Sequence, residues 1–241
     1  MKIFYAGDST CAHNDITTYP QAGLGQGLEL YVKKEIKIHN HAMNGRSTKS
    51  FIDEGRLAVI EQEMSEGDFL LIQFGHNDEK EFDKARYTTP FGTYKEYLKI
   101  YIDAARKAGA IPVLITPLER RCFVDPWTLG TGAHGEYVAG MKAVAVEEDV
   151  ALIDLYTKSR KCMEDAGAVA TTRWFMHLAK GEYSSCPEGK VDDTHLKHEG
   201  AIIFAGLIAE GLQELGGCYA DLLVEGIGVL AAEKYDGVVE A

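Results

Sequence analysis

The chain has 241 residues, 46% of them hydrophobic and 26% charged, which is ordinary for a soluble globular protein of one or two domains. Its net charge of −12, from 25 basic and 37 acidic residues, argues against a nucleic-acid partner, because phosphate binding requires a basic surface. No apolar run approaches the roughly 20 residues that cross a membrane, so no membrane partner is expected.

Strand-like apolar runs alternate with helical stripes along the chain. The predicted strands cover residues 2–6, 36–42, 68–74, 111–116 and 150–155. The predicted helices lie near residues 23–33, 57–64, 94–105, 137–145 and 201–215. This order predicts an α/β protein with a three-layer α/β/α, flavodoxin-like fold around a central parallel five-stranded sheet. We expect one domain over residues 1–216, and an extension over 217–241 that is helical around 219–234 and packs on the same domain.

Four polar loops follow the first four predicted strands. They contain Gly7–Thr10, Asn44–Ser47, Gly75–Asp78 and Pro117–Phe123. Ligands bind at the carboxyl ends of the strands in parallel sheets, so these loops are expected to open on one edge.

Ser9, directly after the first strand, admits three interpretations. Serine, aspartate and threonine are common helix caps, and this interpretation requires nothing else. A phosphate cradle is disfavoured, because no glycine-rich phosphate motif follows the strand and Asp8 would repel a phosphate. The motif "GLGQG" (23–27) has no lysine and follows no strand. A nucleophile would require a base and an anion-stabilising site elsewhere in the chain.

His195 stands out among the eight histidines as a candidate base. It lies in "VDDTHLKHEGA" with Asp192 three residues before it, and a carboxylate near an imidazole fixes its tautomer and stabilises the imidazolium. The alternative is that Asp192 or Asp193 only caps the final helix. By contrast, His39 and His41 alternate on a strand, so at least one of them is expected to be structural.

Gly45 and Asn77 are candidate donors for the oxyanion of an ester-hydrolysis intermediate. Gly45 offers an unobstructed backbone N–H and Asn77 a side-chain amide. Taken singly, Asn44-Gly45 is also typical of a turn and Asn77-Asp78 of a helix cap. Together with Ser9 and the Asp-x-x-His segment, they converge on one rim of the predicted sheet.

The blocks "AGDST", "NGRS", "GHND" and "DDTHL" resemble those of the SGNH (GDSL-type) hydrolases, in the same order and over residues 1 to about 215. No G-x-S-x-G is present, which separates the chain from the α/β-hydrolases. "GDST", "TPFGTYKEYL" and "ITPLERR" are similar to the rhamnogalacturonan acetylesterases, which remove acetyl groups from pectin without a metal.

This resemblance implies that Ser9 is the nucleophile, His195 the base and Asp192 its partner. It implies an oxyanion hole formed by the N–H groups of Ser9 and Gly45 and by the amide of Asn77. It also implies that no metal and no cofactor is needed, and that the partner is an acetylated oligosaccharide. The oligomeric state is left open.

The five cysteines favour a reducing compartment, because their number is odd and they form no C-x-x-C pair. Only six residues precede Gly7, too few for an export signal. A cytoplasmic location is therefore expected if the chain is complete. Secreted fungal members of the family carry a signal and paired cysteines, so this chain is expected to act on imported oligosaccharides rather than on intact pectin.

Arginines near the predicted rim are candidates for binding a uronate carboxylate, which a guanidinium grips in a forked geometry. They are Arg120 and Arg121 after the fourth strand and Arg46 after the second. The alternative is ordinary surface salt bridging. Trp127 and Trp174 are either sugar-stacking residues or core residues.

The sequence leaves three alternatives to an acetylesterase open. A metal site is one, with ligands drawn from His76, Asp192, Asp193, His195 and His198. A lipase-like or thioesterase activity is disfavoured, because the loop 79–84 is charged rather than apolar. A non-catalytic flavodoxin-like binding module is the third, since fold alone does not fix function.

Overall fold

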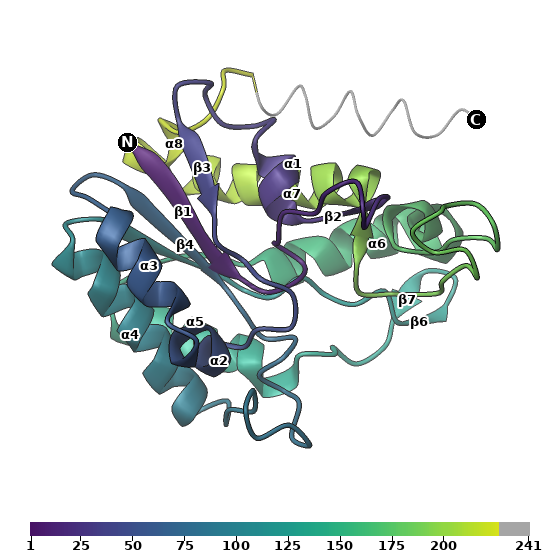
Figure 1. The fold of residues 1–241 in the computed structure, drawn as a ribbon, viewed down its shortest axis with the longest axis horizontal. Coiled ribbons are helices and arrows are strands. Elements are labelled where there is room, and N and C mark those ends of the chain that lie inside the picture. Colours follow the sequence, from purple (N-terminus) through teal and green to yellow (C-terminus); the bar gives the residue numbers. More distant parts are fainter. Residues whose placement is uncertain (227–241) are drawn as a thin grey trace.

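A parallel five-stranded sheet forms the middle layer of the molecule (Figure 1). The computed structural model describes residues 1–226. The strands run in the order β3 (Lys37–Asn40), β1 (Lys2–Gly7), β4 (Phe69–Gln73), β5 (Ile111–Ile115) and β8 (Ala151–Ile153). The predicted three-layer fold is confirmed.

Helices cover both faces of this sheet (Figure 1). One face carries α2 (Thr48–Asp53), α3 (Arg56–Glu63), α4 (Thr93–Lys107) and α5 (Gly135–Glu147). The other carries α1 (Leu24–Leu28), α6 (Leu155–Thr171) and α7 (His198–Leu215). The shorter elements are β2 (Gln21–Ala22), β6 (Phe123–Asp125), β7 (Thr128–Leu129), η1 (Thr172–Trp174), β9 (Leu196–Lys197) and α8 (Gly217–Ala220). None of the helices in the described part of the chain is long and apolar enough to cross a membrane.

Alternate side chains of β1 enter two separate hydrophobic clusters, as the period of a strand requires. Ile3 and Tyr5 pack into the cluster formed with α1 and α7. Phe4 and Ala6 pack into the cluster formed with α3, α4 and α5. All five residues of β4 are buried, which matches the continuous apolar run in the sequence.

The helix α4 begins and ends as its sequence indicates. Its apolar stripe is buried, and the hydroxyls of Tyr94 and Tyr101 donate to the carbonyls of Phe74 and Thr48, both at 2.9 Å. Gly109, which has a positive φ of 72°, follows the end of this helix. The aromatic face therefore packs in the core without unpaired hydroxyls.

The segment after α7 differs from the prediction. The helix α8 ends at Ala220, Leu222 and Leu223 are buried, and Leu223 forms a bridge with Val32. The predicted helix around 219–234 is therefore wrong for residues 221–226, and residues 227–241 lie outside the described residues. The helix α6 was not predicted, and α1 is shorter than the predicted helix over 23–33.

The two ends of the domain meet where α1 packs on α7. Gly27 of α1 lies so close to α7 that a Cβ atom there would be 2.2 Å from the carbonyl oxygen of Ala201. Next to this contact, β2 pairs with β9, with Ala22 opposite Leu196. The segment directly after His195 is thereby held against the segment that follows Ser9.

We expect Gly27→Ala to destabilise the protein by about 1–3 kcal/mol, because the added methyl group must displace the backbone of α7. Urea unfolding measures this change. Glu29→Ala, at the exposed end of the same helix, is the matched control and should leave stability nearly unchanged. Equal stability of Gly27→Ala and the wild type would show that this contact is not tight.

Candidate active site

Three side chains from distant parts of the chain form a hydrogen-bonded row. Nε2 of His195 lies 2.9 Å from Oγ of Ser9, and its Nδ1 lies 2.7 Å from Oδ2 of Asp192. Oδ1 of Asp192 accepts from the backbone N–H groups of Thr194 and His195 at 2.9 and 3.0 Å. This arrangement lets the imidazole take the hydroxyl proton of Ser9 while the carboxylate holds its ring.

Asp192 is the ionised partner of His195. Burial would raise the pKa of Asp192, but hydrogen bonds from His195 and Lys190 outweigh it and hold the pKa well below its usual range. The neighbouring Asp193 instead pairs with Arg121 and His177, at 2.8 and 2.7 Å. The structure thus brings Asp192, and not Asp193, to the ring of His195.

The turn after β1 is capped by Asp8 rather than by Ser9. Oδ1 of Asp8 accepts from the N–H and the hydroxyl of Thr10, at 2.9 and 2.8 Å. This leaves the hydroxyl of Ser9 for His195. The turn is tight at Gly7, where a Cβ atom would lie 2.9 Å from both Sγ of Cys11 and the carbonyl oxygen of Gln73.

The two predicted oxyanion donors lie on the same cleft as Ser9. Nδ2 of Asn77 donates one hydrogen to the carbonyl of Arg46 at 3.0 Å, while Oδ1 accepts from Nζ of Lys80 at 2.8 Å. Because an ammonium group can only donate, this contact fixes which way the amide points and leaves its second N–H unused. Among the described residues, the N–H groups of Ser9 and Gly45 also have no acceptor.

Gly45 has a positive φ of 81°, a conformation that glycine adopts without strain. This turn directs the chain from β3 across the mouth of the cleft. Asp78 links this loop region to α2. Its buried carboxylate accepts hydrogen bonds from the N–H and hydroxyl of Thr48, at the start of α2, and from the hydroxyl of Thr88. Burial raises the pKa of Asp78 to about 7.

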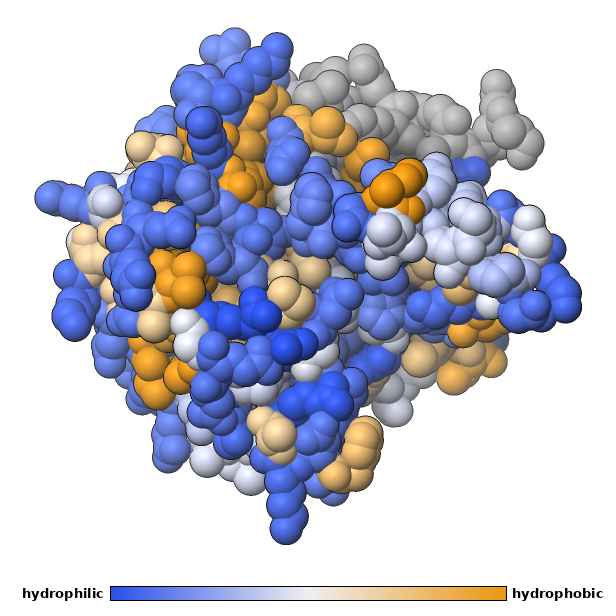
Figure 2. Space-filling view, viewed as in Figure 1, coloured by the Kyte–Doolittle hydropathy of each residue, from blue (hydrophilic) through white to orange (hydrophobic). Residues whose placement is uncertain are grey.

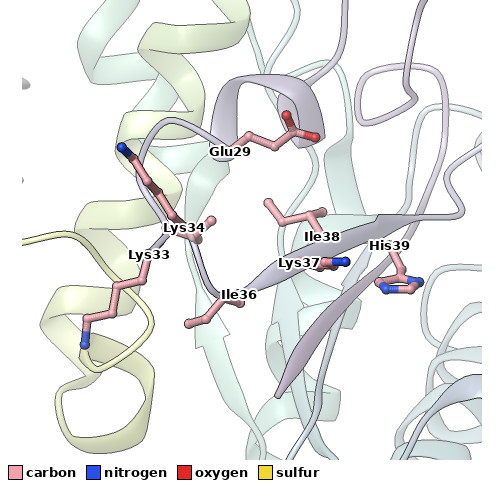
Figure 3. A pocket seen from close by; sticks show the side chains of 8 residues that line it. Glu29, Lys33, Lys34, Ile36, Lys37, Ile38 and His39 are labelled. Carbon is pink, nitrogen blue, oxygen red and sulfur yellow. The ribbon is translucent and has the colours of Figure 1, made fainter.

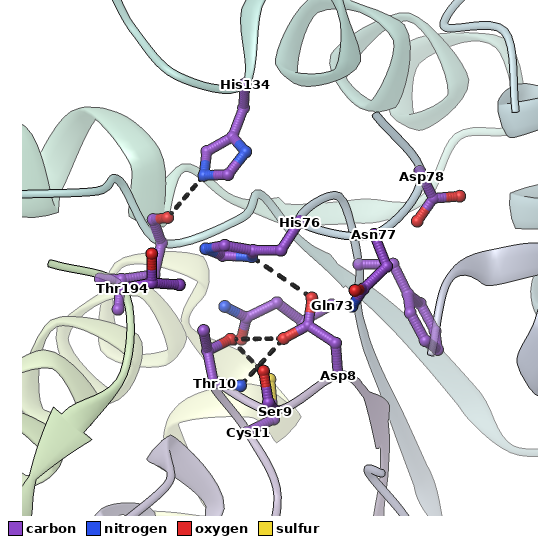
Figure 4. A network of polar contacts seen from close by, with 12 residues as sticks. Asp8, Ser9, Thr10, Cys11, Gln73, His76, Asn77, Asp78, His134 and Thr194 are labelled. Carbon is purple, nitrogen blue, oxygen red and sulfur yellow. Dashed lines mark hydrogen bonds and ion pairs between the residues drawn. The ribbon is translucent and has the colours of Figure 1, made fainter. Parts of the chain in front are cut away.

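The buried imidazole of His76 lies next to Asp8, in the network of polar contacts around Ser9 (Figure 4). Nδ1 of His76 is 3.3 Å from Oδ2 of Asp8, and its ring stacks edge-on against His134 with centroids 4.3 Å apart. Burial lowers the pKa of His76 to about 4, while the pKa of Asp8 falls to about 2 because contacts with His76 and Thr10 outweigh its burial. At neutral pH the pair is therefore a neutral imidazole beside a carboxylate.

Glu79 joins three loops around the cleft. Its carboxylate contacts Nδ1 of His134 at 3.1 Å and the guanidinium of Arg120 at 2.7 Å. Arg120 in turn donates to the hydroxyl of Thr194 at 2.6 Å, next to His195. Burial opposes ionisation of Glu79, but His134 and Arg120 outweigh it and lower its pKa. The loops after β4 and β5 thus brace the loop that carries His195.

The cleft has a volume of about 300 Å³, and every residue that lines it is polar or glycine. The lining residues are Ser9, Gln21, Asn44, Gly45, His76, Asn77, Lys80, Arg120, Thr194 and His195. Its cations are Lys80 and Arg120. Sequence reasoning assigned no site role to Lys80, His134 or Glu79, and it considered His76 only as a metal ligand. The charge of the loop 79–84 indicates only that it is not apolar, and buried polar pairs leave no periodic signal.

Arg46 and Arg121, which were predicted to bind substrate, do not line this cleft. Nε of Arg46 pairs with Glu54 at 2.8 Å on the outer side of its loop. Besides its ion pair with Asp193, the guanidinium of Arg121 donates to the hydroxyl of Thr171 at 2.9 Å and to the carbonyl of Ala168. The cleft takes its guanidinium from Arg120 instead.

The remaining candidates lie elsewhere. Trp174 is a core residue with only 1% of its surface exposed. Trp127 is exposed, and its ring lies next to Gly167. The metal ligands weighed from the sequence do not gather into one group. Within residues 1–226, the cluster of three metal-ligating side chains that does form is His39, His41 and Glu63.

The sequence is similar to a described protein family and to several named relatives. The model described as "GDSL-like Lipase/Acylhydrolase family" matches residues 5–201. The rhamnogalacturonan acetylesterase RhgT of Bacillus subtilis is 40% identical over 226 residues, covering 93% of this chain and 94% of the relative. The rhamnogalacturonan acetylesterase of Emericella nidulans is 25% identical over 240 residues, covering 92% and 89%.

Solved structures with the same fold include the following two. YxiM of Bacillus subtilis superposes with a TM-score of 0.76 at 27% identity, over 89% of this chain but only 56% of the length of YxiM. A mutant of the acetylxylan esterase Axe2 from Geobacillus stearothermophilus superposes with a TM-score of 0.57 at 15% identity, over 87% and 93%.

We expect His76→Gln to flatten the pH dependence of stability on the acid side. The pKa of His76 is about 4 in the folded protein and ordinarily 6.5, so the unfolded chain binds more protons between these values. Wild-type stability therefore falls as the pH drops through this window. In the variant, the difference in bound protons between the unfolded and folded states should be smaller by up to about one, so its stability should fall less steeply as the pH drops.

Urea unfolding at a series of pH values measures this slope. His13→Ala, which removes an exposed imidazole, should keep the wild-type slope. Parallel curves for His76→Gln and the wild type would contradict a neutral, buried His76.

Proposed function

The chain belongs to the GDSL-like lipase/acylhydrolase family, and from that premise we propose that it hydrolyses acetyl esters on pectin-derived rhamnogalacturonan oligosaccharides. The observation that carries this proposal is the row formed by Ser9, His195 and Asp192 at the mouth of a polar cleft. The 40% identity to RhgT over almost the full length of both chains supports the substrate class.

The first step forms an acetyl-enzyme. Nε2 of His195 takes the proton of the Ser9 hydroxyl as Oγ bonds to the acetyl carbon, and the carbonyl electron pair moves to oxygen. The N–H groups of Ser9 and Gly45 and the free N–H of Asn77 then donate to this oxyanion. The electron pair then returns from the oxyanion to re-form the carbonyl, the bond between the acetyl carbon and the sugar oxygen breaks, and the imidazolium of His195 protonates that sugar oxygen.

The second step reverses these roles with water. His195 removes a proton from a water molecule, the water oxygen bonds to the acetyl carbon, and Oγ of Ser9 leaves and regains its proton. Throughout both steps the ionised Asp192 stabilises the positive charge on the imidazole. Acetate is released and the free enzyme is restored.

The lining of the cleft favours a sugar ester over a lipid ester. Its side chains are polar, whereas a long acyl chain needs apolar surface to leave water. On the face shown in Figure 2, hydrophobic residues form separate small groups among hydrophilic ones. A short acetyl group on a hydroxyl-rich leaving group fits these surroundings.

We expect Ser9→Ala to lower the rate of acetate release by about four orders of magnitude or more, because it removes the nucleophile. The assay compares acetylated rhamnogalacturonan, xylan and chitin oligosaccharides. Ser184→Ala, at an exposed serine, should keep wild-type activity.

Both variants should unfold at the wild-type temperature, which separates lost chemistry from lost folding. Substantial turnover by Ser9→Ala would contradict the mechanism. Faster deacetylation of xylan or chitin than of rhamnogalacturonan oligosaccharides would contradict the substrate.

We expect Arg120→Ala to raise KM for esters of acidic sugars by about ten- to a hundredfold, since a charge-assisted hydrogen bond contributes about 1.5–3 kcal/mol. KM for p-nitrophenyl acetate should change much less. Arg46→Ala, whose guanidinium pairs with Glu54 away from the cleft, is the matched control. An equal change of KM for both substrates would show that Arg120 acts only by bracing Thr194.

A further inference from the structure

Two histidines on the edge strand lie beside a glutamate at the end of α3. His39 belongs to β3 and His41 follows it, so their side chains fall on the same face of the strand. Both rings pack against Phe4, with centroids 5.1 and 5.9 Å away. Glu63 is the last residue of α3. The backbone therefore presents three ligating groups to one place at the edge of the sheet.

These groups are close enough to share one ion. One nitrogen of each histidine and one oxygen of Glu63 all lie within 4.8 Å of one another. Nδ1 of His39 is 3.5 Å from Oε2 of Glu63. Ligands at about 2.0–2.2 Å from a tetrahedral zinc ion are about 3.3 Å apart, so small side-chain rotations would complete the set.

The charges of the cluster also suit a cation. His39 and His41 each offer one ring nitrogen to the place where the carboxylate of Glu63 lies. Among the residues that the structure describes, the carboxylate of Glu63 forms an ion pair only with His39. Lys2 approaches Glu63 at its backbone oxygen, at 2.7 Å, and Arg56 pairs with Glu54.

The lysine-lined surface beside β3 does not belong to the cluster of His39, His41 and Glu63. His39 also borders a cavity of about 460 Å³ beside β3, lined by Lys33, Lys34 and Lys37 (Figure 3). Ammonium groups do not ligate metals and disfavour a cation in that cavity. The side towards Glu63 is where a carboxylate and both imidazoles meet.

We propose that His39, His41 and Glu63 form a zinc site that links the edge strand β3 to α3. Two imidazoles and one carboxylate suit zinc better than magnesium or calcium, which prefer oxygen ligands alone. The side chains of His39 and Glu63 are 33% and 45% exposed, so a fourth position is open to water. The site takes no part in the ester chemistry, and it steadies the strand that leads towards Gly45.

The experiment titrates metal-free protein with zinc chloride in a calorimeter. We expect one zinc per chain for the wild type, and binding at least about tenfold weaker in His39→Ala, His41→Ala and Glu63→Gln, since even second-shell losses cost ten- to a hundredfold. His13→Ala, at an exposed histidine outside the cluster, should bind zinc like the wild type. Zinc should also raise the unfolding temperature of the wild type but not of the His39→Ala/His41→Ala variant.

Cobalt(II) gives a second readout, because a four-coordinate site yields intense visible absorption that these variants should lose. Activity towards p-nitrophenyl acetate should be equal in the metal-free wild type and the double variant, which shows that both are folded. Absence of zinc binding by the wild type would overturn the proposal. Unchanged binding by the double variant would do the same, because the zinc would then lie elsewhere.

Discussion

The site depends on one contact between distant parts of the chain. Ser9 and His195 are 186 residues apart, yet their hydrogen bond is 2.9 Å long. The loops that carry Ser9 and His195 are positioned by the elements that follow them. The packing of α1 on α7, with Gly27 against the backbone at Ala201, brings the two segments together, and the pairing of β2 with β9 aligns them. Core packing thus sets the distance on which the proton transfer depends.

Buried charge is the second constraint, because an ion taken out of water must be compensated by nearby partners. Around the cleft, Asp192 and Glu79 each have their own hydrogen-bonding partners. Asp192 has His195 and Lys190, and Glu79 has His134 and Arg120. These sets also connect loops from different strands, so the compensation of charge and the positioning of the catalytic groups are the same interactions.

Much of this arrangement follows from local sequence, and some does not. The spacing of Asp192 and His195 places both groups on one short loop, so their contact was predictable. Arg120 and Arg121 are adjacent, yet the first faces the cleft and the second faces Asp193. Which neighbour points inward depends on the path of an irregular loop. The helix predicted after residue 219 failed for a related reason, because tertiary contacts of Leu222 and Leu223 override local helical preference.

The two cationic side chains of the cleft, Lys80 and Arg120, have different hydrogen-bonding partners. Lys80 holds Oδ1 of Asn77 at 2.8 Å, and burial and the nearby guanidiniums of Arg86 and Arg120 lower its pKa. A substrate carboxylate that drew Lys80 away would release the amide that must face the oxyanion. Arg120 can donate to such a carboxylate without disturbing Asn77, because its own hydrogen bonds go to Glu79 and Thr194 and not to this amide.

We therefore expect recognition of an acidic sugar to be separable from stabilisation of the transition state. The contact of Lys80 with Asn77 involves no group of the leaving sugar, so a neutral acetyl ester should meet the same proposed oxyanion donors as an acidic one.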